Sequence, residues 1–88
     1  MTRPFQVVLT VVAQEDMKRL DSTMRTRLLD KLEWMGENAE LLRHQALGDE
    51  WSGAFKYRVG NYRIIYQLDR TTGKLVVLKA RHRREVYK

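Results

Sequence analysis

Basic side chains alternate with apolar ones in the second half of the chain, and their types and spacing could support phosphate chemistry. Lys56 and Arg58 stand two residues apart, and Arg63 follows a Gly60-Asn61 pair. Guanidinium groups bind phosphate oxygens through two parallel hydrogen bonds. An amine crowded by two guanidinium groups gives up its proton more readily than a solvated one, so Lys56 is a candidate base. The pattern indicates a surface for a polyanion.

A second group of candidate binding residues lies near the C-terminus and combines cations with an imidazole and a phenol ring. Its members are Lys79, Arg81, His82, Arg83, Arg84 and Tyr87. An aromatic ring can stack on an unpaired base, which stabilises a complex by about 1–3 kcal/mol per base. His82 could act as an acid or base near neutral pH, but a supporting or phosphate-contacting role is the favoured interpretation. We interpret His44 as structural or solvated, and Trp34 and Trp51 as apolar anchors.

Two segments with a period of two, residues 55–59 and 62–68, are expected to position the first group. Gly60-Asn61 between them predicts a two-residue hairpin turn. The resulting register pairs Val59 with Tyr62, Arg58 with Arg63, Tyr57 with Ile64, Lys56 with Ile65 and Phe55 with Tyr66. The aromatic and aliphatic members then face the core, and the basic ones face outward.

Arg58 and Arg63 are therefore expected to lie directly cross-strand, with Cβ atoms about 4.5–5.5 Å apart. Like charges so placed destabilise a sheet, which favours a face that binds an anion. The alternative is an ordinary solvated face that Asp49 or Glu50 neutralises.

The remaining pattern predicts an α+β fold in the order β-α-α-β-β-β. Residues 5–9 are apolar and β-branched, two amphipathic helices follow from Ala13 onward, and residues 75–78 form a continuous apolar run. Asp21-Ser22 offers an N-cap for the second helix, and Gly36 and Asn38 mark its C-terminal end. We expect an antiparallel sheet with a helical hairpin packed on one face.

Composition limits the possibilities further. The 88 residues form one expected domain, residues 1–88, with a net charge of +6 that belongs entirely to the second half. Because the chain has no cysteine, disulfides, thiolate metal sites and a cysteine nucleophile are excluded, and we expect neither metal nor cofactor. No apolar run reaches the roughly 18 residues of a membrane span, so we expect a cytoplasmic protein that does not bind membranes.

Residues 47–66, together with the run from His82 to Tyr87, resemble the RelE/ParE superfamily of bacterial and archaeal toxins, most closely its RelE branch. The resemblance implies a RelE-like fold, similar in architecture to microbial ribonucleases. It also implies the toxin of a type II toxin–antitoxin module, which enters the ribosomal A site and cuts mRNA there. A RelB-like antitoxin would hold it inactive, and the complex could bind its own operator through the antitoxin.

The resemblance also implies roles for individual residues. Lys56 would be the base that activates the ribose 2′-hydroxyl, and Arg58 and Arg63 would neutralise the phosphate. Arg81 or Arg83 would act on the leaving oxygen, and the resemblance leaves the choice between them open. The remaining positions would bind RNA or stack on a base: Lys79, His82, Arg84 and, for stacking, Tyr87. Arg58 stands where the best-known members have a second lysine.

Two other functions fit the same residues. A ParE-like protein of this fold would inhibit DNA gyrase by binding and would cut no RNA, and a plain RNA-binding module would bind without any cleavage. In either toxin, we expect the antitoxin to place an amphipathic helix against the helical hairpin or a sheet edge and to cover residues 81–87.

Overall fold

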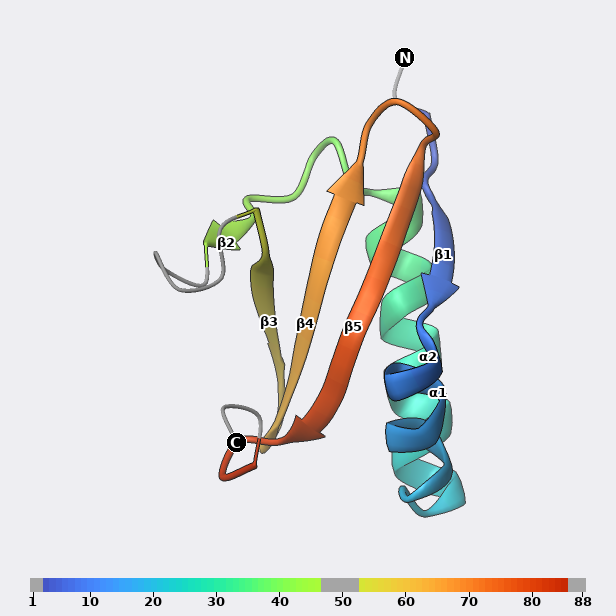
Figure 1. Cartoon of the computed structure of the whole chain (residues 1–88), viewed down its shortest axis with the longest axis vertical. Coiled ribbons are helices and arrows are strands. Elements are labelled where there is room, and N and C mark those ends of the chain that lie inside the picture. Colours follow the sequence, from blue (N-terminus) through green and yellow to red (C-terminus); the bar gives the residue numbers. More distant parts are fainter. Residues whose placement is uncertain (1–2, 47–52, 86–88) are drawn as a thin grey trace.

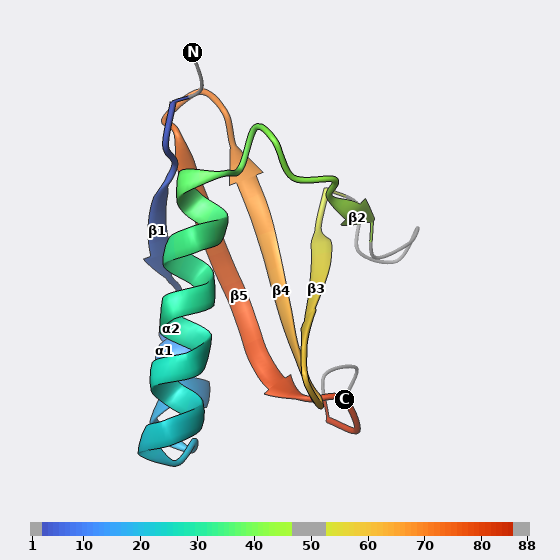
Figure 2. The ribbon, with the colours of Figure 1, turned by 180° about the vertical axis from the view of Figure 1, so that it is seen from behind.

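Two helices pack against a five-stranded sheet in the computed structural model of the protein, which describes residues 3–46 and 53–85 (Figure 1). The elements are β1 (Gln6–Leu9), α1 (Val11–Lys18), α2 (Ser22–Glu37), β2 (Gln45–Ala46), β3 (Phe55–Val59), β4 (Tyr62–Asp69) and β5 (Lys74–His82). The strand order in the sheet is β1-β5-β4-β3-β2. Both helices lie on the β1 and β5 side, whereas β2 and β3 lie away from them (Figure 2). No helix within the described segments is long and apolar enough to cross a bilayer.

Side-chain caps fix where the helices begin. Thr10 caps α1 by accepting a hydrogen bond from the Ala13 amide at 3.1 Å, so this helix begins two residues before the expected Ala13. Asp21 caps α2 as predicted, because its Oδ1 accepts from the Met24 amide at 2.7 Å. The apolar stripe of α2 is buried in the core, as its spacing predicted.

Gly36 lies inside the last turn of α2, and the helix ends at Glu37 with Asn38 as its C-cap. The Phe5 amide donates to the Gly36 carbonyl at 2.7 Å, which ties the start of β1 to the helix. A Cβ atom on Gly36 would lie 2.6 Å from the Phe5 carbonyl oxygen. The glycine therefore serves this close approach rather than helix termination.

The sheet is mixed, and here the expectation of an antiparallel sheet was wrong for one strand. β2–β3, β3–β4 and β4–β5 pair antiparallel, but β1 runs parallel to β5, from the Gln6–Lys74 pair to the Leu9–Val77 pair. A tight turn forces neighbouring strands to be antiparallel, whereas β1 is joined to the sheet through two helices and has no such constraint. The short strand β2, in a segment without hydrophobic period, was also not predicted.

The β3–β4 hairpin has the predicted register at all five pairs. On its inner face, Val59, Ile64 and Tyr66 are buried in the main core, and the other aromatic residues pack half-buried against them. A second, smaller apolar cluster lies on the outer face, where Ile65 and Ala54 are buried beside Leu78. The outer face of the sheet, which neither α1 nor α2 covers, thus combines this apolar patch with the basic residues described next.

Candidate nucleic-acid interface

Three arginines from three adjacent strands form a row across the outer face of the sheet. Arg58 of β3 pairs with Arg63 of β4, which in turn pairs with Arg81 of β5. Residues directly opposite each other on antiparallel strands present their side chains on the same face. The predicted Arg58–Arg63 pair is therefore present, and the structure adds Arg81 to it. We call this set the arginine row.

A second row lies one pleat further along the same face and contains Lys56. Gln45 of β2 pairs with Lys56, which pairs with Ile65, which pairs with Lys79. A depression of about 210 Å³ is lined by Gln45, Lys56, Arg58 and Arg63. The structure thus brings the predicted base and two predicted phosphate-binding arginines to one small hollow. Gln45 was missed because the segment around it carries no periodic signal.

Most of the positive charge in the arginine row has no carboxylate partner among the described residues. The Arg58 Nε donates to the Gly60 carbonyl at 3.2 Å, and the Arg63 Nη1 contacts the Tyr62 carbonyl at 3.5 Å. Asp49 and Glu50, the acids of the alternative interpretation, lie outside the described residues. Neighbouring guanidinium groups repel one another, and a bound phosphate relieves this repulsion and accepts their hydrogen bonds. Such a row is therefore well suited to bind phosphate.

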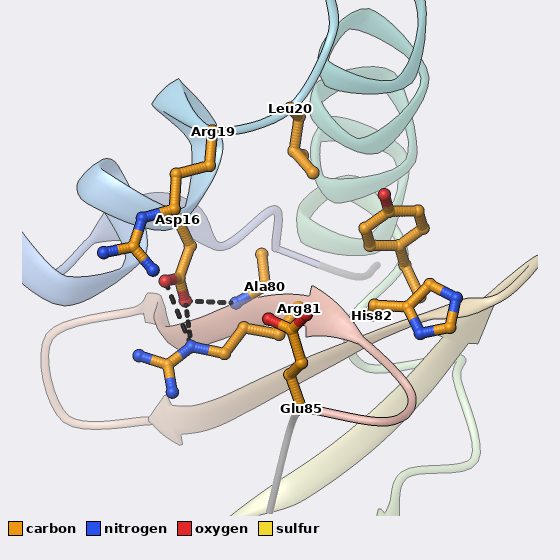
Figure 3. Close-up of a pocket in the computed structure, with 8 residues that line it drawn as sticks. Asp16, Arg19, Leu20, Ala80, Arg81, His82 and Glu85 are labelled. Atoms are coloured by element: carbon orange, nitrogen blue, oxygen red, sulfur yellow. Dashed lines mark hydrogen bonds and ion pairs between the residues drawn. The ribbon is translucent and has the colours of Figure 1, made fainter. Parts of the chain in front are cut away.

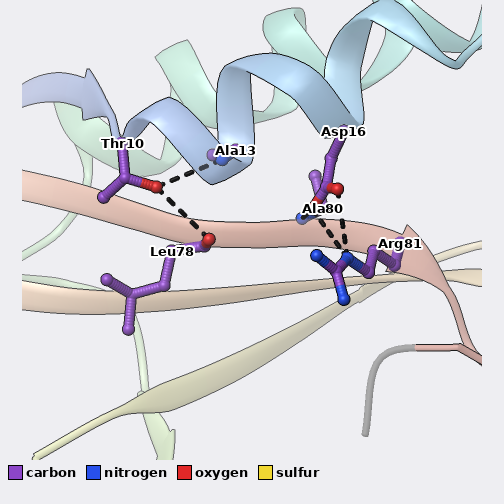
Figure 4. Close-up of polar contacts among 6 residues, drawn as sticks. All are labelled: Thr10, Ala13, Asp16, Leu78, Ala80 and Arg81. Carbon is purple, nitrogen blue, oxygen red and sulfur yellow. Dashed lines mark hydrogen bonds and ion pairs between the residues drawn. The ribbon is translucent and has the colours of Figure 1, made fainter. Parts of the chain in front are cut away.

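Arg81 differs, because it is held by a buried carboxylate from α1. Its Nε lies 3.1 Å from Oδ1 and 3.0 Å from Oδ2 of Asp16, and the Ala80 amide donates to the same Oδ2 at 3.1 Å (Figures 3 and 4). Asp16 is only 4% exposed. Sequence reasoning missed it, although a signal was present. Asp16 follows Ala13 by three residues on the apolar side of α1, where a carboxylate requires a partner.

His82 lies on the opposite face from Lys56, because it pairs with the inward-facing Tyr62. Its ring stands edge-on to the Tyr62 ring with centroids 5.5 Å apart, and its Nδ1 accepts from the Arg84 amide at 3.3 Å. Beside it is a pocket of about 260 Å³ (Figure 3). The residues lining it are Asp16, Arg19, Leu20, Tyr62, Ala80, Arg81, His82 and Glu85.

The remaining candidates lie at or beyond the end of β5. Arg83 and Arg84 are exposed in the turn that follows the strand, where the Arg83 amide donates to the Asn61 carbonyl at 2.8 Å. Arg83 is therefore next to the β3–β4 turn and outside the arginine row. Tyr87, the predicted stacking residue, lies outside the described residues. Among residues 3–46 and 53–85, no cluster of three His, Asp or Glu side chains could hold a metal ion.

A buried polar contact anchors the segment that carries Gln45. The His44 Nδ1 lies 2.6 Å from the Tyr66 hydroxyl, and its Nε2 lies 2.6 Å from the Ala39 carbonyl. Because a carbonyl only accepts, Nε2 donates to Ala39, and in the tautomer with its hydrogen on Nε2 the ring accepts a hydrogen bond from the Tyr66 hydroxyl at Nδ1. Burial, and to a lesser extent repulsion from Tyr57, raises the pKa of Tyr66 to about 12. His44 is structural in this arrangement, as its position in the sequence suggested.

The architecture just described is shared with bacterial toxins of known structure. The toxin–antitoxin complex RelBE2 from Mycobacterium tuberculosis superposes with a TM-score of 0.82 at 23% identity, covering 91% of this chain and 99% of that one. A mutant of E. coli toxin RelE in the free state gives a TM-score of 0.79 at 18% identity, covering 97% of this chain and 90% of that one. The fold is therefore that of the RelE/ParE toxins, as the sequence resemblance implied.

The sequence comparisons agree with the fold. Residues 7–87 match the family model described as the ParE toxin of the type II toxin–antitoxin system, parDE, and the protein belongs to this family. Toxin RelG of Mycobacterium tuberculosis is 26% identical over 85 residues, which cover 97% of this chain and 98% of that protein. The protein is thus a toxin of the RelE/ParE superfamily.

Proposed function

We propose that this toxin is a ribosome-dependent endoribonuclease that cuts mRNA in the ribosomal A site. The observation that carries the proposal is the arginine row with Lys56 beside it, on the face of the sheet that neither α1 nor α2 covers. Guanidinium groups at the spacing of adjacent strands match the oxygens of one or two phosphates of an RNA chain. This face is shallow, so a ribosome that holds the mRNA strand would supply the positioning that the toxin lacks.

The chemistry is an attack of a ribose 2′-hydroxyl on its adjacent phosphorus. Lys56 takes the hydroxyl proton, while Arg58 and Arg63 neutralise the charge that builds on the phosphoryl oxygens. The P–O5′ bond breaks as the new P–O2′ bond forms, which leaves a 2′,3′-cyclic phosphate and a 5′-oxygen that takes up a proton. Tyr87 stacks on or orients a base of the mRNA, and Lys79 and Arg84 contact the flanking strand, whereas His82 lies on the opposite face and takes no part.

Arg81 is the better candidate for stabilising the leaving 5′-oxygen. It continues the row of Arg58 and Arg63, whereas Arg83 lies in the turn beyond the strand. In an in-line displacement the leaving oxygen lies opposite the attacking one, so the group that stabilises it belongs on the far side of Arg63 from Lys56, where β5 places Arg81.

Inhibition of DNA gyrase is the second candidate function, and the family model supports it because its description is that of a ParE toxin. In this case the basic face would bind its target without any bond being cut. The two functions predict different products, so they can be separated in one comparison.

The decisive experiment is a translation reaction on a defined mRNA with mapping of the cut sites, run beside a supercoiling assay with purified gyrase. Wild type should cut ribosome-bound mRNA and leave cyclic-phosphate ends, and Lys56→Ala and Arg63→Ala should cut at least about 100-fold more slowly. Arg70→Ala, which removes one exposed charge from the β4–β5 turn, is the matched control and should cut normally. Intact mRNA together with inhibited supercoiling would establish the gyrase alternative instead.

The proposed partner that restrains this activity is a RelB-like antitoxin. Antitoxins of that kind are present in the complexes with which the fold compares, including the archaeal RelE–RelB complex from Pyrococcus horikoshii. An apolar groove of about 430 Å³ runs between β1 and α2, lined by Phe5, Val7, Leu9, Leu29, Leu32, Glu33 and Glu37. Its composition suits an amphipathic helix. We expect a second part of the antitoxin to bring acidic residues onto residues 81–87.

A further inference from the structure

Asp16 is buried, charged and shared between two groups of β5. Its Oδ2 accepts the Ala80 amide, and both carboxylate oxygens contact the Arg81 Nε (Figure 4). It is the buried charged residue of the described core, with a side chain only 3% exposed. Burying a carboxylate is costly unless hydrogen bonds and a cation compensate it, so this position has strict requirements.

One role of Asp16 is to complete the edge of β5. β1 stops pairing with β5 at Val77. Beyond that point, Thr10 and residues of α1 make the hydrogen bonds to this edge of β5. The Thr10 amide donates to the Val77 carbonyl at 3.1 Å, and the Thr10 hydroxyl donates to the Leu78 carbonyl at 3.3 Å (Figure 4). Asp16 then satisfies the next free amide, that of Ala80. This role needs an acceptor but not a charge.

The second contact of Asp16 does depend on charge. It grips Arg81 through Nε alone, and the two Nη nitrogens make no hydrogen bond to any residue in the ranges 3–46 and 53–85. The Arg81 side chain keeps 24% of its surface exposed. Because a guanidinium group is planar and rigid, fixing Nε on one side fixes the direction in which the Nη groups point. The carboxylate also offsets the repulsion between Arg81 and its cross-strand neighbour Arg63.

We propose that Asp16 is a positioning residue that fixes the guanidinium group of Arg81 so that its Nη groups can meet a phosphate oxygen of the RNA. The inference rests on the proposed function, because it assigns Arg81 to the reacting phosphate. It adds that the first helix takes part in the site, although every residue implied by the sequence lies on β3, β4, β5 or beyond.

Two substitutions separate the structural role from the positioning role. Asp16→Asn keeps an amide oxygen in place of Oδ2 for the Ala80 N–H, but its NH₂ group replaces Oδ1 beside the Arg81 Nε, so the negative charge and one of the two oxygens that hold Arg81 are lost. Thr10→Val removes the hydroxyl bond to Leu78 at the same edge and the N-cap bond to the Ala13 amide, and it leaves the contacts between Asp16 and Arg81 in place. The first variant therefore weakens the hold on Arg81 and keeps most of the edge, and the second is the control for lost stability at this edge and at the start of α1.

The first test is cleavage of ribosome-bound mRNA by wild type, Asp16→Asn, Arg81→Ala and the double variant. Asp16→Asn should lower kcat by about 10- to 100-fold with little change in KM, as expected when a reacting group is misplaced by about 1 Å. Added to Arg81→Ala, it should cause no further loss. Thr10→Val should retain kcat. An equal loss from Asp16→Asn with and without Arg81, or full activity of Asp16→Asn, would overturn the proposal.

Guanidinium ion provides a rescue that a purely structural role does not predict. It should restore part of the activity of Arg81→Ala, where Asp16 is free to bind the ion, and none in the double variant. Rescue that is equal in the two backgrounds would contradict the proposal.

A measurement that does not need activity keeps this inference separate from the proposed function. In the NMR spectrum of the free toxin, the Arg81 Nε–H should exchange slowly with water in wild type and in Thr10→Val, and rapidly in Asp16→Asn. If the wild type shows slow exchange but cuts no mRNA, the nuclease function is rejected, while the contact between Asp16 and Arg81 is confirmed. Rapid exchange in wild type would reject the positioning role even if cleavage is observed.

Discussion

The Tyr66 hydroxyl donates a hydrogen bond to the His44 Nδ1 across 2.6 Å, and this bond joins the segment before β2 to the centre of the sheet. Tyr66 is 1% exposed and belongs to the main core, while His44 also packs against the Phe55 ring at a centroid distance of 5.3 Å. Because Gln45 directly follows His44 and lines the hollow at Lys56, the contact supports one wall of the candidate site.

Tyr66→Phe should lower the free energy of unfolding by about 1–2 kcal/mol, because it leaves the Nδ1 of His44 without its donor in a half-buried position. Equilibrium denaturation in urea measures the effect. Tyr57→Phe is the control, since Tyr57 is half-buried on the same inner face and its hydroxyl makes no hydrogen bond to a described residue. Equal stability of the Tyr66→Phe variant and wild type would mean that the bond contributes nothing net.

Alkaline pH should destabilise the protein through the same tyrosine. Burial raises the pKa of Tyr66 to about 12, while in the unfolded chain a tyrosine ionises near 10. Between these values the folded state binds more protons than the unfolded state, so the free energy of unfolding falls as the pH rises from about 10 to 12. The full loss is roughly 2–3 kcal/mol. Urea midpoints measured across this range should fall less steeply in Tyr66→Phe, and parallel slopes would refute the assignment.

Gly36→Ala should be destabilising although alanine is the better helix former. Its Cβ would lie 2.6 Å from the Phe5 carbonyl oxygen and 2.9 Å from a methyl group of Val7. Overpacking of this kind costs about 1–3 kcal/mol, which exceeds the gain of up to about 1 kcal/mol in helix propensity. Thr26→Ala, at an exposed position of the same helix, should be neutral or slightly stabilising. Thermal unfolding of both variants gives the comparison, and a higher melting temperature for Gly36→Ala would contradict the close contact.

The parts of this fold that sequence could predict are those set by local pattern. The turn at Gly60 and a period of two fixed five residue pairs of the β3–β4 hairpin, and hence the Arg58–Arg63 neighbours. The direction of β1 was mispredicted because its partner is far away in the chain and no turn joins them. The contacts of Arg81 with Arg63 and with Asp16 also connect residues far apart in the chain, so local pattern could not predict them.

The same contrast holds for the candidate site. Residue type and alternation placed Lys56, Arg58 and Arg63 on one face without any structure. The sequence alone does not show whether Arg81 or Arg83 acts on the leaving oxygen. The structure distinguishes them, because β5 ends at His82 and the carboxylate of Asp16 on α1 contacts Arg81. His82 illustrates the limit, since its pairing with Tyr62 turns it away from the face that its sequence neighbours suggested.

The salt dependence of RNA binding should report directly on the arginine row. Each phosphate contact on a single strand contributes about 0.7 to the slope of log K against log salt concentration, because it releases condensed counterions. Arg63→Ala should therefore reduce the slope for a short single-stranded RNA by about 0.7, and Arg58→Ala should do the same. Arg70→Ala, with an exposed charge in the turn between β4 and β5, should leave the slope unchanged. Fluorescence anisotropy at several salt concentrations measures all four proteins. Equal slopes in all of them would mean that the anion bound by this face is not RNA, and would move the arginine row from the nuclease proposal to a protein target such as gyrase.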